Sequence, residues 1–557
     1  MARSHRSNIV AFVLGPLLAS AQLLAQQEQH PAAQPGTSGT AVPGQNPPAT
    51  RQDPDQQAPQ QQDPNAKGGA QVDPQGPPDV PAVDLEADRT GAPIREFTLE
   101  DALRVGRAHN ATLRAAELLP ERARLDILVA EAVFEPELYA DTTYGESESP
   151  QRNQFQPSIS RTTMDASLGW RQRVVTGGLF DLAFHPARFE TSGSTAFPDK
   201  QFTAEWTASY RQPLLRGAWS DYNLAPADAA RFEYSRARND YEQTVQDTLL
   251  RIVEAYWELV YARKNWEVVV SALAVAEEQL RITDARIAVQ ELAARDRVAD
   301  QAEVARRREE LIVAENGIRS REDVLRVLLY DGAQPGGWRA NLRPTSPIAI
   351  DDTAPLPDLE PCIDRALEQR PELRSQRSSI AAAEIVQMET ERDILPALDL
   401  VGSWSSDGAR DSFHDAFHDA SNLDYPDWSV SLEFSLPIGN HAAKARRQQA
   451  RLDVERLRRQ LHADTLLITT QVRDAVRNLA SLRQSISASA ESMQLAESNL
   501  ETERAKLRVG ASTNFEVQRR NQDLREARNR HLRNLLDYRV AESRLLHVQG
   551  VLQAPQS

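Results

Sequence analysis

Residues 472–507 read VRDAVRNLASLRQSISASAESMQLAESNLETERAKL, and an apolar residue recurs at every seventh position of this stretch. The recurring residues are Val472, Leu479, Ile486, Met493, Leu500 and Leu507. An earlier stretch has the same spacing, in Val245, Ile252, Leu259, Trp266, Leu273, Leu280 and Ile287. Such sustained heptads predict helices that pack as a left-handed coiled coil. The first helix, from Ala225 to about Val289, would be roughly 100 Å long at ~1.5 Å per residue, which no compact domain needs.

The second heptad stretch copies the first at a shift of 220 positions, and the correspondence continues past both stretches. It places Val304, Ile318 and Leu325 on Leu524, Tyr538 and Leu545. Each long helix is therefore predicted to turn back into a second helix, with turns near residues 290–295 and 510–515. Gly510 favours such a turn because glycine readily adopts the left-handed conformation that ends helices. Its equivalent, Gln290, is a weaker helix breaker.

The regions before the long helices also correspond, at a shift of 260 positions and without a gap. The shift places Leu99, Leu103, Leu113, Arg114, Pro136 and Leu138 on Leu359, Ile363, Leu373, Arg374, Pro396 and Leu398. We therefore predict two internal repeats, residues 95–335 and 358–551. Residues 336–357 form the linker between them, and residues 552–557 are a short C-terminal tail.

Strands are predicted between the short helical regions and the long helices of both repeats. Residues 202–211 and 428–436 alternate strictly between apolar and polar types, and a period of two indicates strands with one apolar and one polar face. About ten such residues fit a tilted strand of an outer-membrane barrel, and a half-buried soluble sheet is the alternative. Further strands are expected near residues 138–144, 164–170, 179–184 and 398–404. The middle two form a hairpin around Gly177 and Gly178 that the second repeat lacks.

The N-terminal residues 1–25 are predicted to be a secretory signal peptide. A basic start precedes a mostly apolar stretch and small-residue cleavage candidates, and the alternative of an N-terminal membrane anchor is disfavoured because Gly15 and Pro16 interrupt that short stretch. Residues 26–94 consist largely of Gln, Pro, Asp, Gly and Ala. A segment of this composition buries too little apolar surface to fold, so we predict a disordered linker.

The composition of the chain excludes several classes of protein. It has 557 residues with 80 acidic and 64 basic side chains, a net charge of −16. An acidic chain is poorly suited to binding nucleic acid, which requires a basic face. The single cysteine, Cys362, cannot form an intramolecular disulfide. The fold must therefore be stabilised by packing.

Export and the two-faced strands together favour an outer-membrane protein. Four or six strands from one chain cannot close a barrel, and lipid does not tolerate an open sheet edge. Several chains are therefore expected to pool their strands.

Several motifs resemble those of the TolC-like outer-membrane efflux proteins, over residues 95 to 550. They are Thr98-Leu99-Glu100-Asp101-Ala102-Leu103, Asn110-Ala111-Thr112-Leu113, Arg370-Pro371-Glu372-Leu373, the strand end Gln212-Pro213-Leu214 and the turn Val509-Gly510-Ala511-Ser512-Thr513-Asn514-Phe515-Glu516-Val517. The resemblance implies an α+β membrane protein, a homotrimer with a shared outer-membrane β-barrel continued by a long α-helical coiled-coil barrel. It departs from the family at the first turn, which lacks the usual glycine, and at the extra hairpin, which leaves the number of barrel strands open.

The resemblance also implies a function and partners. The chain would be the passive exit duct of a tripartite efflux or secretion system in a Gram-negative type envelope. It would receive substrates from a periplasmic adaptor protein and an inner-membrane transporter. The helical-hairpin tips implied for adaptor contact are Leu292, Ala293, Gly510, Ser512 and Thr513. Asp296 and Glu516 would line the periplasmic entrance, although Arg519 would offset part of their charge. The cargo, whether drugs, metals or proteins, is not encoded in these motifs.

The sequence gives little indication of a metal site or a catalytic site. His414 and His418 lie four residues apart and could share a metal on a helix, but a solvated loop between two strands is the favoured interpretation. The sequence contains no nucleophile elbow, phosphate loop or metalloprotease motif, so we predict neither an enzyme nor a cofactor. The alternative function is a structural periplasmic coiled-coil scaffold with a soluble sheet.

Overall fold

A computed structural model describes residues 94–149, 159–192, 200–290, 292–330, 341–350 and 355–554. These residues belong to a compact unit that spans Ala82–Ser557. The predicted signal peptide, nearly all of the predicted linker 26–94 and the end of the predicted tail lie outside the described residues.

The first half of the unit proceeds from short helices through strands to a long helical pair. Its described elements are β1 (Ile94–Phe97), α2 (Leu99–His109), α3 (Ala111–Ala116), α4 (Leu118–Glu131), the 3-10 turn η2 (Ala132–Phe134), β2 (Glu137–Ser149), β3 (Ile159–Arg173), β4 (Leu179–Ser192), β5 (Lys200–Pro213), α5 (Ser220–Asn223), α6 (Ala225–Ala288) and α7 (Ala294–Leu329).

The second half follows the same order with fewer strands. Its described elements are β6 (Asn341–Pro344), α9 (Leu359–Gln369), α10 (Pro371–Arg392), β7 (Ala397–Arg410), α11 (Phe413–Asn422), β8 (Pro426–Ser435), α12 (His441–Arg508) and α13 (Asn514–Val548). The segment predicted as an inter-repeat linker thus contains β6, which pairs in parallel with β1. The start of the predicted tail packs into the core through Leu552 and Ala554, each 4% exposed.

Local sequence explains where the short helices begin. Thr98 and Asp101 form a capping box at the start of α2, in which each side chain binds the backbone N–H of the other. Asn110 ends α2 and caps α3, and its amide donates 2.8 Å to the carbonyl of Leu328 on α7. The short helices are thereby fixed to the long ones.

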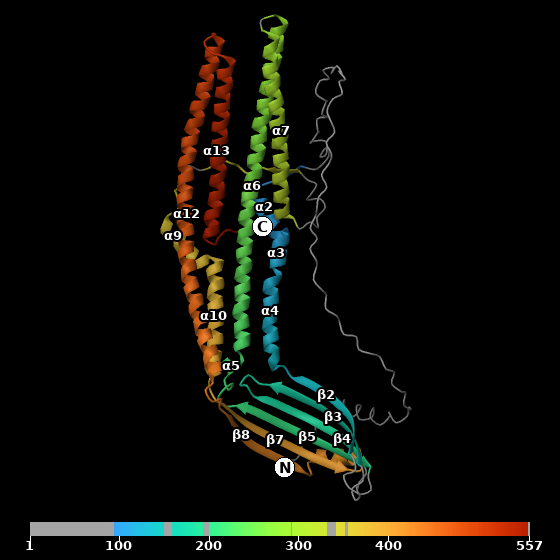
Figure 1. Cartoon of the computed structure of the whole chain (residues 1–557). Coiled ribbons are helices and arrows are strands. Elements are labelled where there is room, and N and C mark those ends of the chain that lie inside the picture. Colours follow the sequence, from blue (N-terminus) through green and yellow to red (C-terminus); the bar gives the residue numbers. More distant parts are fainter. Residues whose placement is uncertain are drawn as a thin grey trace, which may run out of the picture. The chain divides into compact units, whose positions relative to one another are not determined.

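The long helices form a wall whose order is fixed by ion pairs and packing. Next to the sheet the order is α4, α6, α10, α12, and toward the tips it is α7, α6, α13, α12. Arg231 of α6 pairs with Glu131 of α4 at 2.5 Å, and Arg458 of α12 with Glu384 of α10 at 2.6 Å. Figure 1 shows the helical pairs α6–α7 and α12–α13 pointing away from the sheet.

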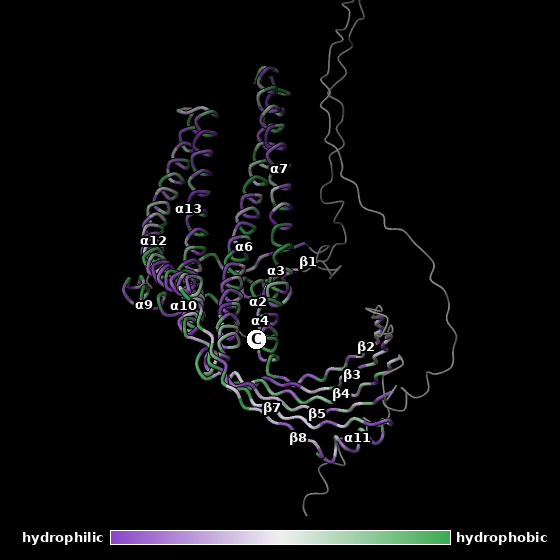
Figure 2. Tube along the Cα trace, turned by 60° about the horizontal axis from the view of Figure 1, so that its bottom comes forward, coloured by the Kyte–Doolittle hydropathy of each residue, from purple (hydrophilic) through white to green (hydrophobic). Residues whose placement is uncertain are grey.

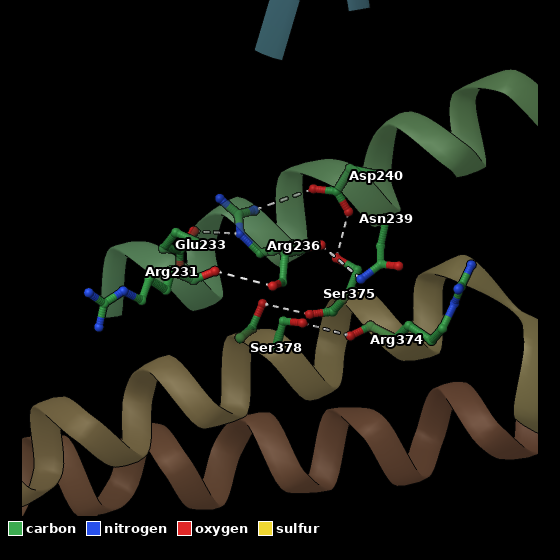
Figure 3. A network of polar contacts seen from close by, with 10 residues as sticks. Arg231, Glu233, Arg236, Asn239, Asp240, Arg374, Ser375 and Ser378 are labelled. Atoms are coloured by element: carbon green, nitrogen blue, oxygen red, sulfur yellow. Dashed lines mark hydrogen bonds and ion pairs between the residues drawn. The ribbon is translucent and has the colours of Figure 1, made fainter. Parts of the chain in front are cut away.

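Polar contacts join the two halves of the chain between α6 and α10 (Figure 3). The hydroxyl of Ser375 on α10 donates to a carboxylate oxygen of Asp240 on α6 at 2.5 Å. Arg374 of α10 also pairs with Glu242 of α6. These contacts hold the second half beside the first near the end of α10 that is farther from the sheet.

The heptad seams are the core of this wall. Ile252 and Leu259 are completely buried in a cluster that α6 shares with α2, α7 and α13. Val472 and Leu479 are buried in the corresponding cluster of α9, α12 and α13. Cys362 lies in the second cluster, where burial raises the pKa of its thiol. It is a packing residue, in the position that Ala102 occupies in the first half.

The strands predicted from sequence are all present and lie in one antiparallel sheet. The order of its described strands is β2, β3, β4, β5, β7, β8. The hairpin β3–β4 is part of this sheet, between β2 and β5 (Figure 2). None of the described helices combines the length and the apolarity that crossing a membrane as a helix requires.

Candidate functional site: the two-faced sheet and the hairpin tips

One face of the sheet is apolar from edge to edge. Cross-strand partners share a face, so one row joins Leu138, Trp170, Leu182, Ala208, Trp404 and Trp428. On the edge strand β8 the apolar side chains are strongly exposed, with Trp428 at 76% and Leu432 at 66%. An isolated soluble chain would not leave such a surface in water.

The opposite face is polar and carries ion pairs near the helices. Arg211 of β5 contacts Asp399 at 3.0 Å and Glu433 at 2.6 Å, so that one guanidinium joins three strands. Arg171 pairs with Glu137 at 2.8 Å across β3 and β2. This face presents hydrated groups, as the wall of a water-filled channel does.

Further from the helices the polar face is hollowed and acidic. A cavity of about 560 Å³ is lined by Asp141, Asp165, Glu205 and Asp407, together with His185. His185 lies 3.3 Å from the Thr207 hydroxyl. Sequence reasoning did not single out these acids. For Glu205 the signal was present in the strict alternation of residues 202–211, which places every second residue on one face.

The segment with the two histidines is a helix, α11, so the prediction of a solvated loop was wrong. Ser412 caps the helix by accepting from the N–H of Asp415 at 3.2 Å. Its apolar face, Phe413, Ala416, Phe417 and Ala420, packs on Phe184, Ala204 and Trp206 of the apolar sheet face. The missed signal is this spacing of three and four residues after a serine cap. His418 faces outward and contacts Asn422 at 2.9 Å.

The α6–α7 tip turns through a residue that is not glycine. Helix α6 ends at Ala288, and Gln290 follows with a φ of 62°, in the left-handed region. Helix α7 begins at Ala294, so the turn lies where the sequence predicted it. Leu292 is half-buried and Ala293 is exposed.

The α12–α13 tip uses the glycine. Gly510 has a φ of 76°, and the N–H groups of Gly510 and Ala511 bond to the carbonyls of Leu507 and Lys506, a Schellman motif. Thr513 then caps α13 by accepting from the N–H of Glu516 at 3.3 Å. The equivalence of Gln290 and Gly510 is thus visible in the backbone.

Polar contacts brace the second tip. The Ser512 hydroxyl donates to Glu503 of α12, and this hydrogen bond lowers the pKa of that carboxyl. The tips also expose large apolar residues that sequence reasoning missed. Val289 is 67% exposed, its equivalent Val509 is 79% exposed and Phe515 is 68% exposed.

The two predicted entrance acids occupy equivalent positions. Asp296 is the third residue of α7, and Glu516 is the third residue of α13. Glu516 is half-buried, and Arg519 is exposed one turn further along α13. Within one chain these acids belong to different tips.

The junction between sheet and helices is held by polar contacts. The phenol of Tyr222 on α5 donates to Asp393 at 2.6 Å, and burial raises the pKa of this phenol. Arg392, at the end of α10, pairs with Asp221 and lies 4.9 Å from the centre of the Trp219 ring. The part of the chain that the structure describes contains no group of three or more potential metal-ligating side chains.

Several solved outer-membrane proteins share this fold. The CmeC channel of Campylobacter jejuni is 14% identical with a TM-score of 0.59, and the match covers 82% of this chain and 87% of CmeC. The protein VceC of Vibrio cholerae is 15% identical with a TM-score of 0.59, covering 82% and 97%. The MtrE channel of Neisseria gonorrhoeae is 15% identical with a TM-score of 0.59, covering 82% and 90%.

The family comparison agrees with the fold. Residues 362–551 match the family described as Outer membrane efflux protein. No curated protein matches the sequence. The structural matches establish the fold, and the family match adds the efflux-protein class. The resemblance predicted from the sequence is therefore confirmed, and over residues 362–551 the family match supports the predicted class of outer-membrane efflux proteins.

Proposed function

We propose that this protein is the outer-membrane exit duct of a tripartite efflux or secretion system. It conducts substrates passively from a periplasmic adaptor and an inner-membrane transporter to the exterior. The observation that carries the proposal is a sheet with one apolar and one polar face, joined directly to a wall of long helices. The apolar face suits lipid and the polar face suits a water-filled lumen. The duct itself holds no cofactor and catalyses no reaction.

We further propose that the working form is a homotrimer built from two internal repeats per chain. The exposed edges of β2 and β8 support this assembly, because unpaired backbone groups are not tolerated in lipid. The corresponding element order of the two halves supports the duplication.

The trimer is tested by mass in detergent and by fractionation. We expect a trimer that needs heating to dissociate and that stays with outer-membrane vesicles through carbonate washing. A stable monomer would contradict the duct. A protein released by carbonate would instead favour a periplasmic coiled-coil scaffold with a soluble sheet.

The hairpin tips are proposed as the adaptor contact. Leu292, Ala293, Gly510, Ser512 and Thr513 lie in the two turns, next to the exposed valines and phenylalanine described above. Apolar side chains exposed at a tip are suited to a protein partner. Cysteines at Ala293 and Thr513, which are both exposed, should cross-link to the adaptor in intact cells. The same substitution at Ser498, on the exposed face of α12, is the control.

Asp296 and Glu516 are proposed to line the periplasmic entrance. Two acids in each of three chains place up to six carboxylates around one opening, and such a ring favours cations. The double variant Asp296→Asn with Glu516→Gln should reduce cation preference and sensitivity to multivalent cations in planar bilayers. The control is Asp453→Asn with Glu455→Gln. It removes the same charge from the part of α12 near the sheet, far from the tips. Unchanged selectivity in the entrance variant would place the acids outside the pore.

A further inference from the structure

Each of the four helices in the wall next to the sheet connects to its own strand. Helix α4 leads through η2 into β2, β5 leads through α5 into α6, α10 leads into β7, and β8 leads into α12. The order of these helices is α4, α6, α10, α12, which is the order of their strands. Among the described strands, β3 and β4 are the pair without a helix, and they lie between the strands of α4 and α6.

The β3–β4 hairpin is nevertheless a full part of the sheet. Its pairing with β2 runs from Glu137 opposite Arg171 to Ser149 opposite Ile159. Its pairing with β5 runs from Leu179 opposite Arg211 to Glu190 opposite Lys200. The hairpin also continues both faces, with Leu168, Trp170 and Leu182 on the apolar side. A hairpin that lay outside a barrel wall would not keep this alternation.

The width of the sheet explains why the extra strands fit. Four described helices at about 8–10 Å spacing span roughly 32–40 Å. Six described strands at about 4.8 Å spacing, tilted by about 40°, span about 38 Å of barrel wall. Without the hairpin the sheet would span about 25 Å by the same arithmetic. By this arithmetic the six-strand sheet has about the width of the helical wall.

We infer that the outer-membrane barrel of this protein has 18 strands, six from each of three copies. The inference rests on the proposed trimeric duct. Strand β2 runs away from the helices and β8 runs back toward them, so β8 of one copy meets β2 of the next in antiparallel orientation. The alternation of strand directions thus continues across each seam, and the partner on each sheet edge is a second copy of this chain.

The consequence concerns the size of the cargo. A barrel of 18 strands is about 36 Å across between backbones, and side chains that fill about 5 Å on each side leave roughly 26 Å. A barrel of 12 strands would leave about 14 Å. A barrel of six strands per copy would therefore have a wider lumen than a barrel of four strands per copy.

Cross-strand disulfides test the position of the hairpin in the membrane. On the polar face, Thr143 lies opposite Asp165, and Ala187 lies opposite Thr203. The double cysteine variants of these two pairs should oxidise in outer-membrane trimers. The variant with cysteines at Thr143 and Thr203 should not, because two strands separate these positions. Efficient oxidation of that third pair would overturn the inference. The native Cys362 is buried and does not interfere.

Polymer exclusion tests the width of the barrel lumen, first in the wild-type trimer. Uncharged polyethylene glycols about 20 Å in diameter, added at the barrel side of a bilayer, should enter the lumen and lower the conductance. Deletion of Ile159–Ser192 should lower the size cut-off to about 14 Å or less. Exclusion of the 20 Å polymer by a conducting wild-type trimer would overturn the inference and leave the duct intact. A chain that forms neither trimer nor channel would contradict the duct itself.

Discussion

The turns at the two tips have different residues at the equivalent left-handed position. A left-handed residue is needed just after α6 and just after α12, and the chain supplies Gln290 at the first and Gly510 at the second. A side chain in this conformation brings its Cβ close to the following carbonyl oxygen, which costs on the order of 1 kcal/mol. No atom lies within 4 Å of a Cβ placed at Gly510. The free-energy cost of placing a side chain at position 510 therefore comes from the backbone conformation.

Substitution of each residue by the other is expected to have opposite effects on the stability of the two tips. Gln290→Gly should stabilise the closed α6–α7 tip by about 0.5–1 kcal/mol, since glycine removes the penalty but gains unfolded-state entropy. Gly510→Gln should destabilise the other tip by a similar amount. Hydrogen exchange of the tip peptides measures both, as a slowing of about two- to fivefold and a matching acceleration. Faster exchange in Gln290→Gly would show that the glutamine side chain contributes a contact.

The sequence indicated one of these residues better than the other. Glycine at position 510 signals a helix end by itself, and the structure confirms it. Gln290 was identified by its place at the shift of 220, because glutamine has no intrinsic preference for the left-handed conformation. The side-chain contacts of the tip, such as Ser512 with Glu503, depend on two helices meeting, and local sequence does not encode that distance.

Among the described residues, the pair α6–α7 contains a buried ionic contact whose equivalent acid in α12–α13 is only half-buried. Glu322 of α7 is fully buried and pairs with Arg263 of α6 at 2.9 Å and with Arg326 at 3.0 Å. The equivalent of Glu322 in α13 is Glu542, which is half-buried and pairs with Arg539 on its own helix. Removal of one partner from a buried pair leaves uncompensated charge, which costs about 3–5 kcal/mol.

Glu322→Ala is therefore expected to loosen the first helical pair selectively. Hydrogen exchange near residues 259–266 and 318–329 should accelerate by at least about a hundredfold, which corresponds to about 3 kcal/mol. Glu542→Ala is the matched control, and its effect on the second pair should stay within about tenfold because an exposed pair contributes about 1 kcal/mol or less. Equal effects in the two variants would show that burial of Glu322 does not decide the stability of the pair.

The elements themselves were largely predictable. The heptads indicated the long helices, and the strict period of two indicated β5 and β8. The other four described strands of the large sheet were expected at the places where they are found. The exception is α11, whose ten residues were interpreted as a polar loop because His414, Asp415, His418 and Asp419 dominate its composition. Its helical form depends on Phe413, Ala416, Phe417 and Ala420 finding the apolar sheet face, which is a tertiary contact.

The described unit as a whole is organised in columns. Each column consists of one helix of the wall and the strand to which the chain connects it. The order of the columns follows from which helices pack together, and it brings β5 of the first half beside β7 of the second. The repeat shifts predicted matching parts, but they did not predict where the additional hairpin would lie. That position is set by the pairing of β3 with β2 and of β4 with β5, which is a property of the folded sheet.

The N-terminal segment before this unit is expected to be dispensable for assembly. Deletion of residues 26–87, with the signal peptide kept, should leave the detergent-resistant trimer and its dissociation temperature unchanged. The physical reason is compositional, because a segment rich in Gln, Pro, Asp and Gly has little apolar surface to contribute to a packed core.

The measurement is the heat-dissociation temperature of the purified trimer, with the full-length chain treated in parallel. An internal control is truncation of residues 552–557, which removes Leu552 and Ala554 from the core cluster around α6. Loss of a buried leucine costs about 2–5 kcal/mol, so this truncation should lower the dissociation temperature. Equal loss of the trimer in both variants would show that residues 26–87 carry contacts as important as those of the buried C-terminal segment.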